Sequence, residues 1–278
     1  MEALHSRDYQ PETIDLATFT PKYANVIIVD QRFHDSRIHE DFMAVLSRPR
    51  LVTTNCESGL PVRNEFITNK LGHALRFCHF SVSTWGEPGF TIVLKDGLYI
   101  FNDSSSVNYT HYMGVDLEFV GVGQVRFLFQ KTLRSDRPLF SAVSTHLTLK
   151  NIRVYDMRKY RVAGGIVVFA SQEAQISLAR VFIHSVSAYG VSVYGPRSHG
   201  TIKDCTFNGC VRAFSAMDQS EIRAENVVAR DISSFVASAA KGSKLDIFNS
   251  RFVNHDRMIV QGIGVPILTS NDKAQGQY

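Results

Sequence analysis

A repeat with a polar corner, in the second half of the chain, constrains the fold more than any other feature. Five segments follow the pattern apolar-x-apolar-x-polar-apolar-x-apolar, and the polar position is Asn or Asp in four of them. The segments start at residues 147, 176, 200, 222 and 245, so the successive steps are 29, 24, 22 and 23 residues. Alternation on both sides of a polar position predicts two short strands joined by a tight bend, where Asn and Asp tolerate left-handed backbone.

Two columns of residues keep their place in successive repeats. The corner column is Asn151, Arg180, Asp204, Asn226 and Asn249, and a serine column two residues before the segments is Ser198, Ser220 and Ser243. A third apolar strand follows each segment after a polar stretch, near residues 165, 190, 213, 235 and 258. Three strands per repeat at constant register predict a parallel solenoid in which each coil rests on its neighbours. The alternative, an antiparallel β-sandwich, does not stack like residues at a fixed period.

The repeat also sets the predicted domain boundaries. Weaker turns at 91–99 and 116–123 extend it upstream, which predicts about seven coils over residues 89–268. Residues 1–88 do not repeat, and their apolar runs at 25–30 and 51–54, with a helical pattern at 38–46, predict an α/β segment that caps the first coil. Residues 269–278 form a polar tail. The predicted fold is therefore all-β, a parallel β-helix with three strands per coil behind an N-terminal α/β cap.

The coil pattern, opened by an apolar strand and a Gly-Leu-Tyr turn within residues 92–99, resembles the pectin-lyase-like superfamily of right-handed parallel β-helices. The resemblance covers about 180 residues, from 89 to 268, and implies a right-handed coil. It implies little about activity, because the superfamily contains lyases, hydrolases, epimerases, tailspikes and inert scaffolds. Its tailspikes commonly form trimers, so the resemblance leaves a homo-oligomer open. Its enzymes work beside the third strand of the coil.

The third strands carry no sign of such an active site. Alternation predicts that their outward side chains are Val167, Phe169, Ser192, Tyr194, Ala213, Ser215 and Val236. None is acidic, whereas glycoside hydrolysis needs paired carboxylates and lyase chemistry needs a base beside a group that neutralises the uronate. The stretch 198–203 is similar to the Gly-His-Gly and Arg-Ile-Lys elements of polygalacturonases, but the Asn-Thr-Asp and Asp-Asp elements of that family are absent. No catalytic residue is therefore predicted.

Motifs for metals and cofactors are also missing from the sequence. It has no Gly-rich phosphate loop, nucleophile elbow or His-Glu metal motif, so neither a metal nor a cofactor is expected. The four cysteines, Cys56, Cys78, Cys205 and Cys210, lack the spacing of a zinc site or a disulfide framework, which predicts buried free thiols.

Polar stretches before the third strands hold the candidate ligand-binding residues. These are Arg158, Lys159, Tyr160, Arg161, His184, Tyr189, Arg212, His255 and Arg257. Stacked coil over coil, they would form a loop ridge that holds an acidic sugar, a phosphate or an acidic protein surface through bidentate arginine pairing and ring stacking. The alternative interpretation is an ordinary solvated loop face.

The sequence thus favours a non-enzymatic β-helix scaffold or binding protein, of a viral structural, host-interaction or intracellular adaptor type, with a protein partner or an acidic glycan. The alternative is a polysaccharide lyase or glycoside hydrolase acting on an acidic polysaccharide, for which loop carboxylates such as Asp136, Asp156 and Asp231 would have to converge. We expect no pair of them at the separation that hydrolases use.

Charge and hydropathy narrow the partners and the location. The net charge of +4 and the dispersed basic residues disfavour nucleic-acid binding. No apolar run is long enough to cross a membrane, so no membrane association is expected. The amino end has no apolar signal sequence, which predicts an intracellular location, or a virion-associated one if the protein is viral.

Overall fold

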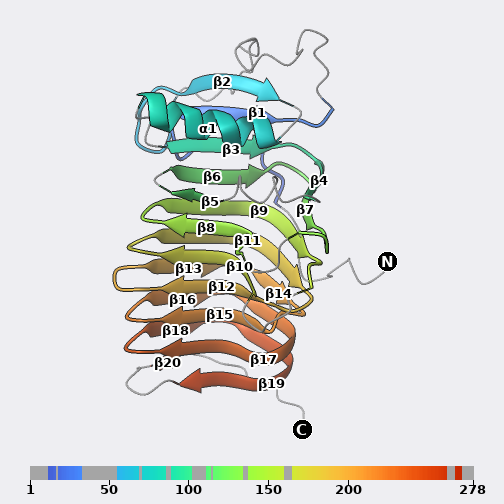
Figure 1. Cartoon of the computed structure of the whole chain (residues 1–278), viewed down its shortest axis with the longest axis vertical. Helices are drawn as coiled ribbons and strands as arrows, with labels where there is room; N and C mark the ends of the chain where they lie inside the picture. Colours follow the sequence, from blue (N-terminus) through green and yellow to red (C-terminus); the bar gives the residue numbers. More distant parts are fainter. Residues whose placement is uncertain are drawn as a thin grey trace.

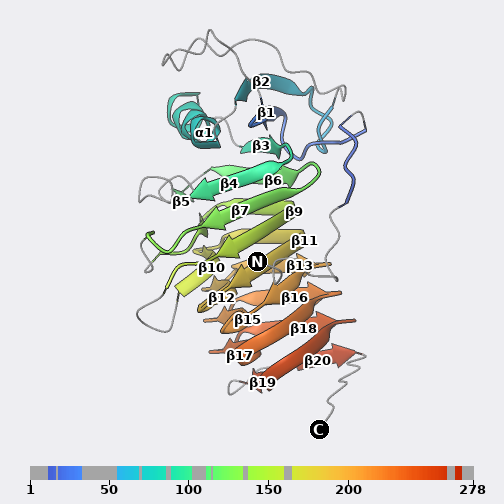
Figure 2. The same cartoon turned by 90° about the vertical axis from the view of Figure 1, so that its right-hand side faces the viewer.

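The computed structural model describes residues 12–16, 18–32, 55–68, 71–85, 89–101, 111–113, 115–133, 137–159, 165–261 and 267–270. In this part of the chain, parallel strands stack into a solenoid of about six turns, close to the number expected, and almost no helix is present. Figures 1 and 2 show the strands stacked along the long axis, with β1, β2 and α1 at one end and β19 and β20 at the other. The predicted all-β solenoid is confirmed.

The first sheet runs the whole length of the solenoid with all neighbours parallel, in the order β2–β1–β3–β6–β9–β11–β13–β16–β18–β20. Its members are β1 (Asn25–Val29), β2 (Arg63–Thr68), β3 (Gly89–Leu94), β6 (Asp116–Gly121), β9 (His146–Asp156), β11 (Gln175–Ser185), β13 (His199–Lys203), β16 (Glu221–Glu225), β18 (Lys244–Phe248) and β20 (Ile267–Ser270). The strand expected at 25–30 is thus confirmed as β1. It pairs directly with β3, so this sheet continues upstream of residue 89.

The second and third sheets complete each coil and are also parallel. The second contains β4 (Gly97–Phe101), β7 (Val125–Phe129), the second halves of β9 and β11, β14 (Thr206–Asn208) and the first halves of β17 (Val228–Ala240) and β19 (Arg251–Gln261). The third contains β5 (His111–Met113), β8 (Phe140–Val143), β10 (Gly165–Ser171), β12 (Ala188–Tyr194), β15 (Arg212–Met217) and the second halves of β17 and β19.

Strands β17 and β19 each pass from the second sheet to the third without a loop. The polar stretches at 230–231 and 254–257 were expected to be loops, and this expectation was wrong. Main-chain pairing to the neighbouring coil persists through the bend, with one register shift between Ile232 and Phe235. Polar composition alone therefore did not mark the ends of these strands.

The corner residues between the first and second sheets adopt the left-handed backbone that the repeat predicts. The φ angles are 56° at Asn151, 52° at Arg180, 53° at Asp204 and Asn226, and 48° at Asn249. Asn and Asp tolerate this conformation because their short polar side chains bond locally. Arg180 adopts it without that advantage, which shows that the stacking of the coils sets the corner.

The serine column lies at a second bend and is buried, with exposures of 0%, 0% and 1% at Ser198, Ser220 and Ser243. The Ser220 hydroxyl donates to the carbonyl of Val193 and accepts from the amide of Met217. At Ser220 the small hydroxyl therefore satisfies buried main-chain groups of its own turn and of the coil before it, and the Ser198 hydroxyl accepts from the amide of Glu173 in the coil before it.

Apolar side chains of all three sheets fill the interior as one continuous core, and helix α1 (Leu71–Trp85) covers its end. Leu71, Ala74, Leu75 and Cys78 lie on one face of the helix and are buried in that core. Helix α1 was not among the elements predicted from the sequence. The helix expected at 38–46 and the strand expected at 51–54 lie outside the described residues. All four cysteines are buried and free, as expected.

Candidate binding face on the third sheet

Three rows of side chains run along the outer surface of the third sheet, from β10 to β17. The strand register places Ile166, Tyr189, Arg212 and Phe235 in the first row, Phe169, Ser192, Ser215 and Ser238 in the second, and Ser171, Tyr194, Met217 and Ala240 in the third. Small serines therefore lie between rows that contain larger side chains. None of these side chains is a carboxylate.

Three residues predicted to point outward on these strands instead face the core. Val167, Ala213 and Val236 are all 0% exposed and belong to the continuous core. Each is followed by a second buried residue, so two consecutive side chains point inward and the alternation shifts by one. Gly190 occupies the same position in β12, where a Cβ atom would lie 2.6 Å from the carbonyl oxygen of Ala213. The predictions for Phe169, Ser192, Tyr194 and Ser215 agree with the register.

Arg212 is held between two aromatic rings on adjacent coils. Its guanidinium carbon lies 4.7 Å from the centre of the Tyr189 ring and 5.3 Å from that of Phe235. Its Nη1 donates to the Ser238 hydroxyl at 3.0 Å, and the Ser238 and Ser215 hydroxyls are 3.1 Å apart. The buried Nε–H of Arg212 has no acceptor among the described residues. Stacking thus fixes the plane of a cation that keeps unused donor capacity.

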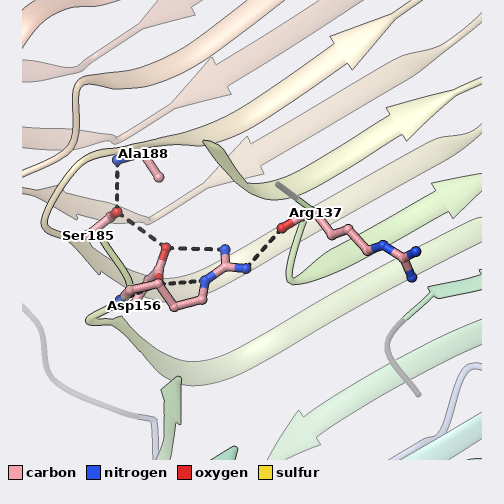
Figure 3. A network of polar contacts seen from close by, with 5 residues as sticks. Arg137, Asp156, Ser185 and Ala188 are labelled. Carbon is pink, nitrogen blue, oxygen red and sulfur yellow. Dashed lines mark hydrogen bonds and ion pairs between the residues drawn. The ribbon is translucent and has the colours of Figure 1, made fainter. Parts of the chain in front are cut away.

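Arg158, the first of the predicted ligand residues, is fully buried and paired within the protein. Its Nε lies 3.0 Å from Asp156 Oδ1, both side chains are 0% exposed, and its Nη1 donates to the carbonyl of Arg137 at 2.9 Å. Ser185 Oγ lies 3.4 Å from Asp156 Oδ2 and accepts from the amide of Ala188. Figure 3 shows these contacts linking segments of three coils. Arg158 therefore does not contribute to an exposed ridge.

His184 lies on a different sheet from the Arg212 stack. His184 is a half-buried residue of β11 on the second sheet, where its ring centre is 6.3 Å from that of Tyr155. Burial lowers the pKa of His184, opposed by the charge of Asp156 and by a hydrogen bond at Asn208. Lys159 is exposed at the end of a described stretch.

The other predicted residues are only partly described. Tyr160 and Arg161 lie outside the described residues. His255 and Arg257 belong to β19, where the strand register pairs Arg257 with Phe235. The structure thus brings Tyr189 and Arg212 into direct contact and aligns Arg257 with them, while His184 belongs to another sheet.

Phe235 and Ser238 were not among the predicted site residues, and Ser192 and Ser215 were predicted only as outward side chains of the third strands, not as part of a binding site. The signal was available, since both rows repeat every 23 residues, from 189 to 212 to 235 and from 192 to 215 to 238. Aligning the third strands by the same columns as the corner segments would have found both rows.

Asp136, Asp156 and Asp231 are the carboxylates that the alternative enzymatic function would require, and the described residues do not bring them together in an acidic site. Asp156 is buried against Arg158, Asp231 lies within β17, and Asp136 falls outside the described residues. The expectation about their mutual separation therefore stays a prediction. Within the described ranges, no group of three or more His, Cys, Asp or Glu side chains is arranged to hold a metal ion.

Comparisons with known proteins add no relative to these observations. No family model, curated protein or solved structure matches the chain. In the part of the chain that the structure describes, no helix has the length and apolar character needed to span a membrane. The function of the chain must therefore be inferred from the solenoid and its surfaces.

Proposed function

We propose that this chain is a non-enzymatic β-helix scaffold or binding protein that recognises an anionic carbohydrate, or another anionic partner, on the outer face of its third sheet. The observation that carries the proposal is the Arg212 guanidinium stacked between Tyr189 and Phe235 beside a row of serines. A planar guanidinium pairs with carboxylate, sulfate or phosphate oxygens, and aromatic side chains offer flat apolar surfaces beside it.

Three further features support a binding role. The Ser238 hydroxyl accepts from Arg212 and is supported in turn by Ser215, so the position of the cation is fixed before any ligand binds. Tyr194 is 41% exposed in the row on the other side of the serines. The rows repeat from coil to coil at the spacing of parallel strands, about 4.8 Å, so they would present equivalent groups to a linear chain lying along the solenoid.

Kinship with the pectin-lyase-like superfamily is part of this proposal and rests on the repeat and the stacked parallel sheets. A viral structural, host-interaction or intracellular adaptor role fits a scaffold of this kind, and an acidic protein surface would use the same arginine. A lyase or hydrolase is the alternative function, but no carboxylate borders the Arg212 stack in the three rows.

A glycan-array and depolymerisation screen of the full chain tests the proposal. Polygalacturonate, alginate and heparin serve as anionic probes and dextran as a neutral one. We expect binding to an anionic chain without cleavage, and a loss of about tenfold or more in affinity for Arg212→Met, typical of a lost charge-assisted contact. Arg223→Met is the matched control, because Arg223 stacks on Phe248 at 5.2 Å in the first sheet.

The same screen can refute the proposal. Depolymerisation that disappears in His184→Ala or Asp231→Asn would favour the enzyme. Equal losses of affinity in the Arg212 and Arg223 variants would show that the third sheet is not the binding face.

A further inference from the structure

An N-terminal strap, formed by residues 12–16 and 18–24, crosses the outer face of the first sheet before the chain enters β1. The strap contacts side chains of β3, β6, β9 and β11, which belong to successive coils. A segment of the chain itself therefore covers part of the outer face of the first sheet.

The C-terminal end of the strap is bound by the buried carboxylate of Glu118. The amide of Lys22 donates to Glu118 Oε2 at 2.8 Å, and the amide of Tyr23 donates to Thr91 Oγ1 at 3.1 Å. The Thr91 hydroxyl donates to the same Glu118 oxygen at 2.8 Å, while Lys150 Nζ lies 2.7 Å from Oε1. Glu118 points outward from β6 yet is 0% exposed, so the strap and these partners replace its water.

The amino end of the strap is held at a corner of the solenoid. The amide of Glu12 donates to Asn151 Oδ1 at 2.8 Å, and Asn151 Nδ2 donates to the carbonyl of Glu12 at 2.9 Å. Arg180, the next corner residue, forms an ion pair with the Glu12 carboxylate. Both Asn151 contacts are to main-chain groups, which every peptide carries.

The middle of the strap is held more loosely. Leu16 and Phe19 pack against a small apolar cluster of Val26, Ile28 and Val93 on the outside of the sheet. A pocket of about 410 Å³ lies where residues 12–15 and 18–20 face Lys150 and the corner. The described residues from 12 to 20 are exposed or half-buried, and segments with few buried contacts open locally before the core unfolds.

We propose that the outer face of the first sheet is a docking surface for an extended peptide, which the strap occupies here as a displaceable intramolecular ligand. Glu118, Thr91 and Asn151 bind main-chain amides and a carbonyl, so they do not require a particular side chain. Selectivity comes from two apolar residues three positions apart, followed by a lysine, as at Leu16, Phe19 and Lys22. The partner is therefore a peptide segment of that pattern, and the proposal is independent of the third-sheet face.

A labelled synthetic peptide with the sequence of residues 12–24 tests this docking. In the unmodified chain the tethered strap competes at an effective concentration in the millimolar range, so the peptide binds weakly. In the full-length variant Leu16→Ser/Phe19→Ser the strap loses its apolar anchors while the surface stays intact. We expect fluorescence polarisation to show at least about tenfold tighter peptide binding to this variant than to the unmodified chain.

A second pair of substitutions locates the bound peptide. In the strap variant, Asn151→Gly removes the amide that binds Glu12 and keeps a residue suited to positive φ. Asn226→Gly is the matched control at an equivalent corner, with φ of 53°, where the Asn226 amide bonds to Asp204. We expect only the Asn151 substitution to weaken peptide binding. Equal peptide affinities for the unmodified chain and the strap variant, or equal effects of the two corner substitutions, would overturn the proposal.

Hydrogen exchange in the unmodified chain gives a test that requires no variant. The amides of Glu12, Lys22 and Tyr23 should exchange through local opening, at least about a hundredfold faster than the paired amides of β6 and β9. Exchange of both groups at one common rate would mean that the strap opens only with the solenoid, and would refute a displaceable ligand.

Discussion

Replacing Arg158 by methionine removes one member of the buried ion pair and is the sharpest test of how the coils are held together. The change removes the cation that faces the Asp156 carboxylate, which has no exposed surface. It also deletes the hydrogen bond from Arg158 Nη1 to the carbonyl of Arg137, which joins this coil to the preceding one. Methionine fills similar space and is flexible, so loss of packing contributes little.

The cost can be bounded from the contacts. Across 3.0 Å at an effective dielectric constant of about 20, the attraction between the two charges is about 5 kcal/mol. Breaking buried pairs by removing one partner costs about 3–5 kcal/mol. Asp156 keeps its contacts with the main-chain amide of residue 158 and with the hydroxyl of Ser185. We therefore expect a loss near the lower bound, about 3 kcal/mol in the free energy of unfolding.

Urea denaturation followed by circular dichroism measures this loss. The double variant Asp156→Asn/Arg158→Met replaces the carboxylate with a neutral amide and should lose only about 1–2 kcal/mol. Arg197→Met is a surface control, because the Arg197–Glu173 pair is largely exposed, and it should change stability by no more than about 0.5 kcal/mol. The reasoning fails if the single Arg158 variant is as stable as the double variant or the control.

The pH dependence of the Arg158 variant gives the same test a second readout. Burial already raises the pKa of the Asp156 carboxyl, although Arg158 opposes that shift. Without Arg158 the folded-state pKa rises further above the unfolded value, so the folded state holds a proton that the unfolded state releases. Stability then increases as the pH falls through this window. The deficit of the variant should be smaller at about pH 5 than at about pH 7.5.

Two other substitutions probe single positions of the solenoid. Asn226→Ala should cost about 1–2 kcal/mol, because φ of 53° is unfavourable for alanine, whereas Asn226→Gly should cost clearly less; equal denaturation midpoints for the two would contradict the role of the corner. At His184, burial lowers the folded-state pKa. As the pH decreases through about 6.5, the unfolded state therefore takes up a proton more readily than the folded state, and the free energy of unfolding decreases. His184→Gln should flatten this fall in denaturation midpoints between about pH 7.5 and pH 5.5, and an unchanged slope would show that other groups cause it.

The repeat predicted most of the solenoid but less of its ends. The corner column was predictable because left-handed backbone selects Asn and Asp locally, at one position per coil. Helix α1 was not, since its segment contains Phe, Val, Ser and Thr, which are mediocre helix formers, and its stability comes from packing Leu71, Ala74, Leu75 and Cys78 on the open core.

Only some residues of the candidate site could be predicted, because the packing of the coils decides which polar side chains are exposed. Tyr189 and Arg212 were chosen as polar residues near the third strands, and the register brings them together. Arg158 was chosen on the same ground and is buried, because coil packing encloses it with Asp156. Composition does not distinguish these cases, since each is a charged or aromatic residue before an apolar strand.

The sequence by itself determined the parallel coils, the corner column and the register of the serine column, because each depends on a local requirement that recurs at a fixed period. The tertiary structure alone decided which way each third-strand side chain points. Val167, Ala213 and Val236 face the core together with the residue that follows each of them, and Arg212 lies between Tyr189 and Phe235 on the outer face. It also decided that the strap covers Glu118, since contacts between residues 96 positions apart arise only when the coils are stacked.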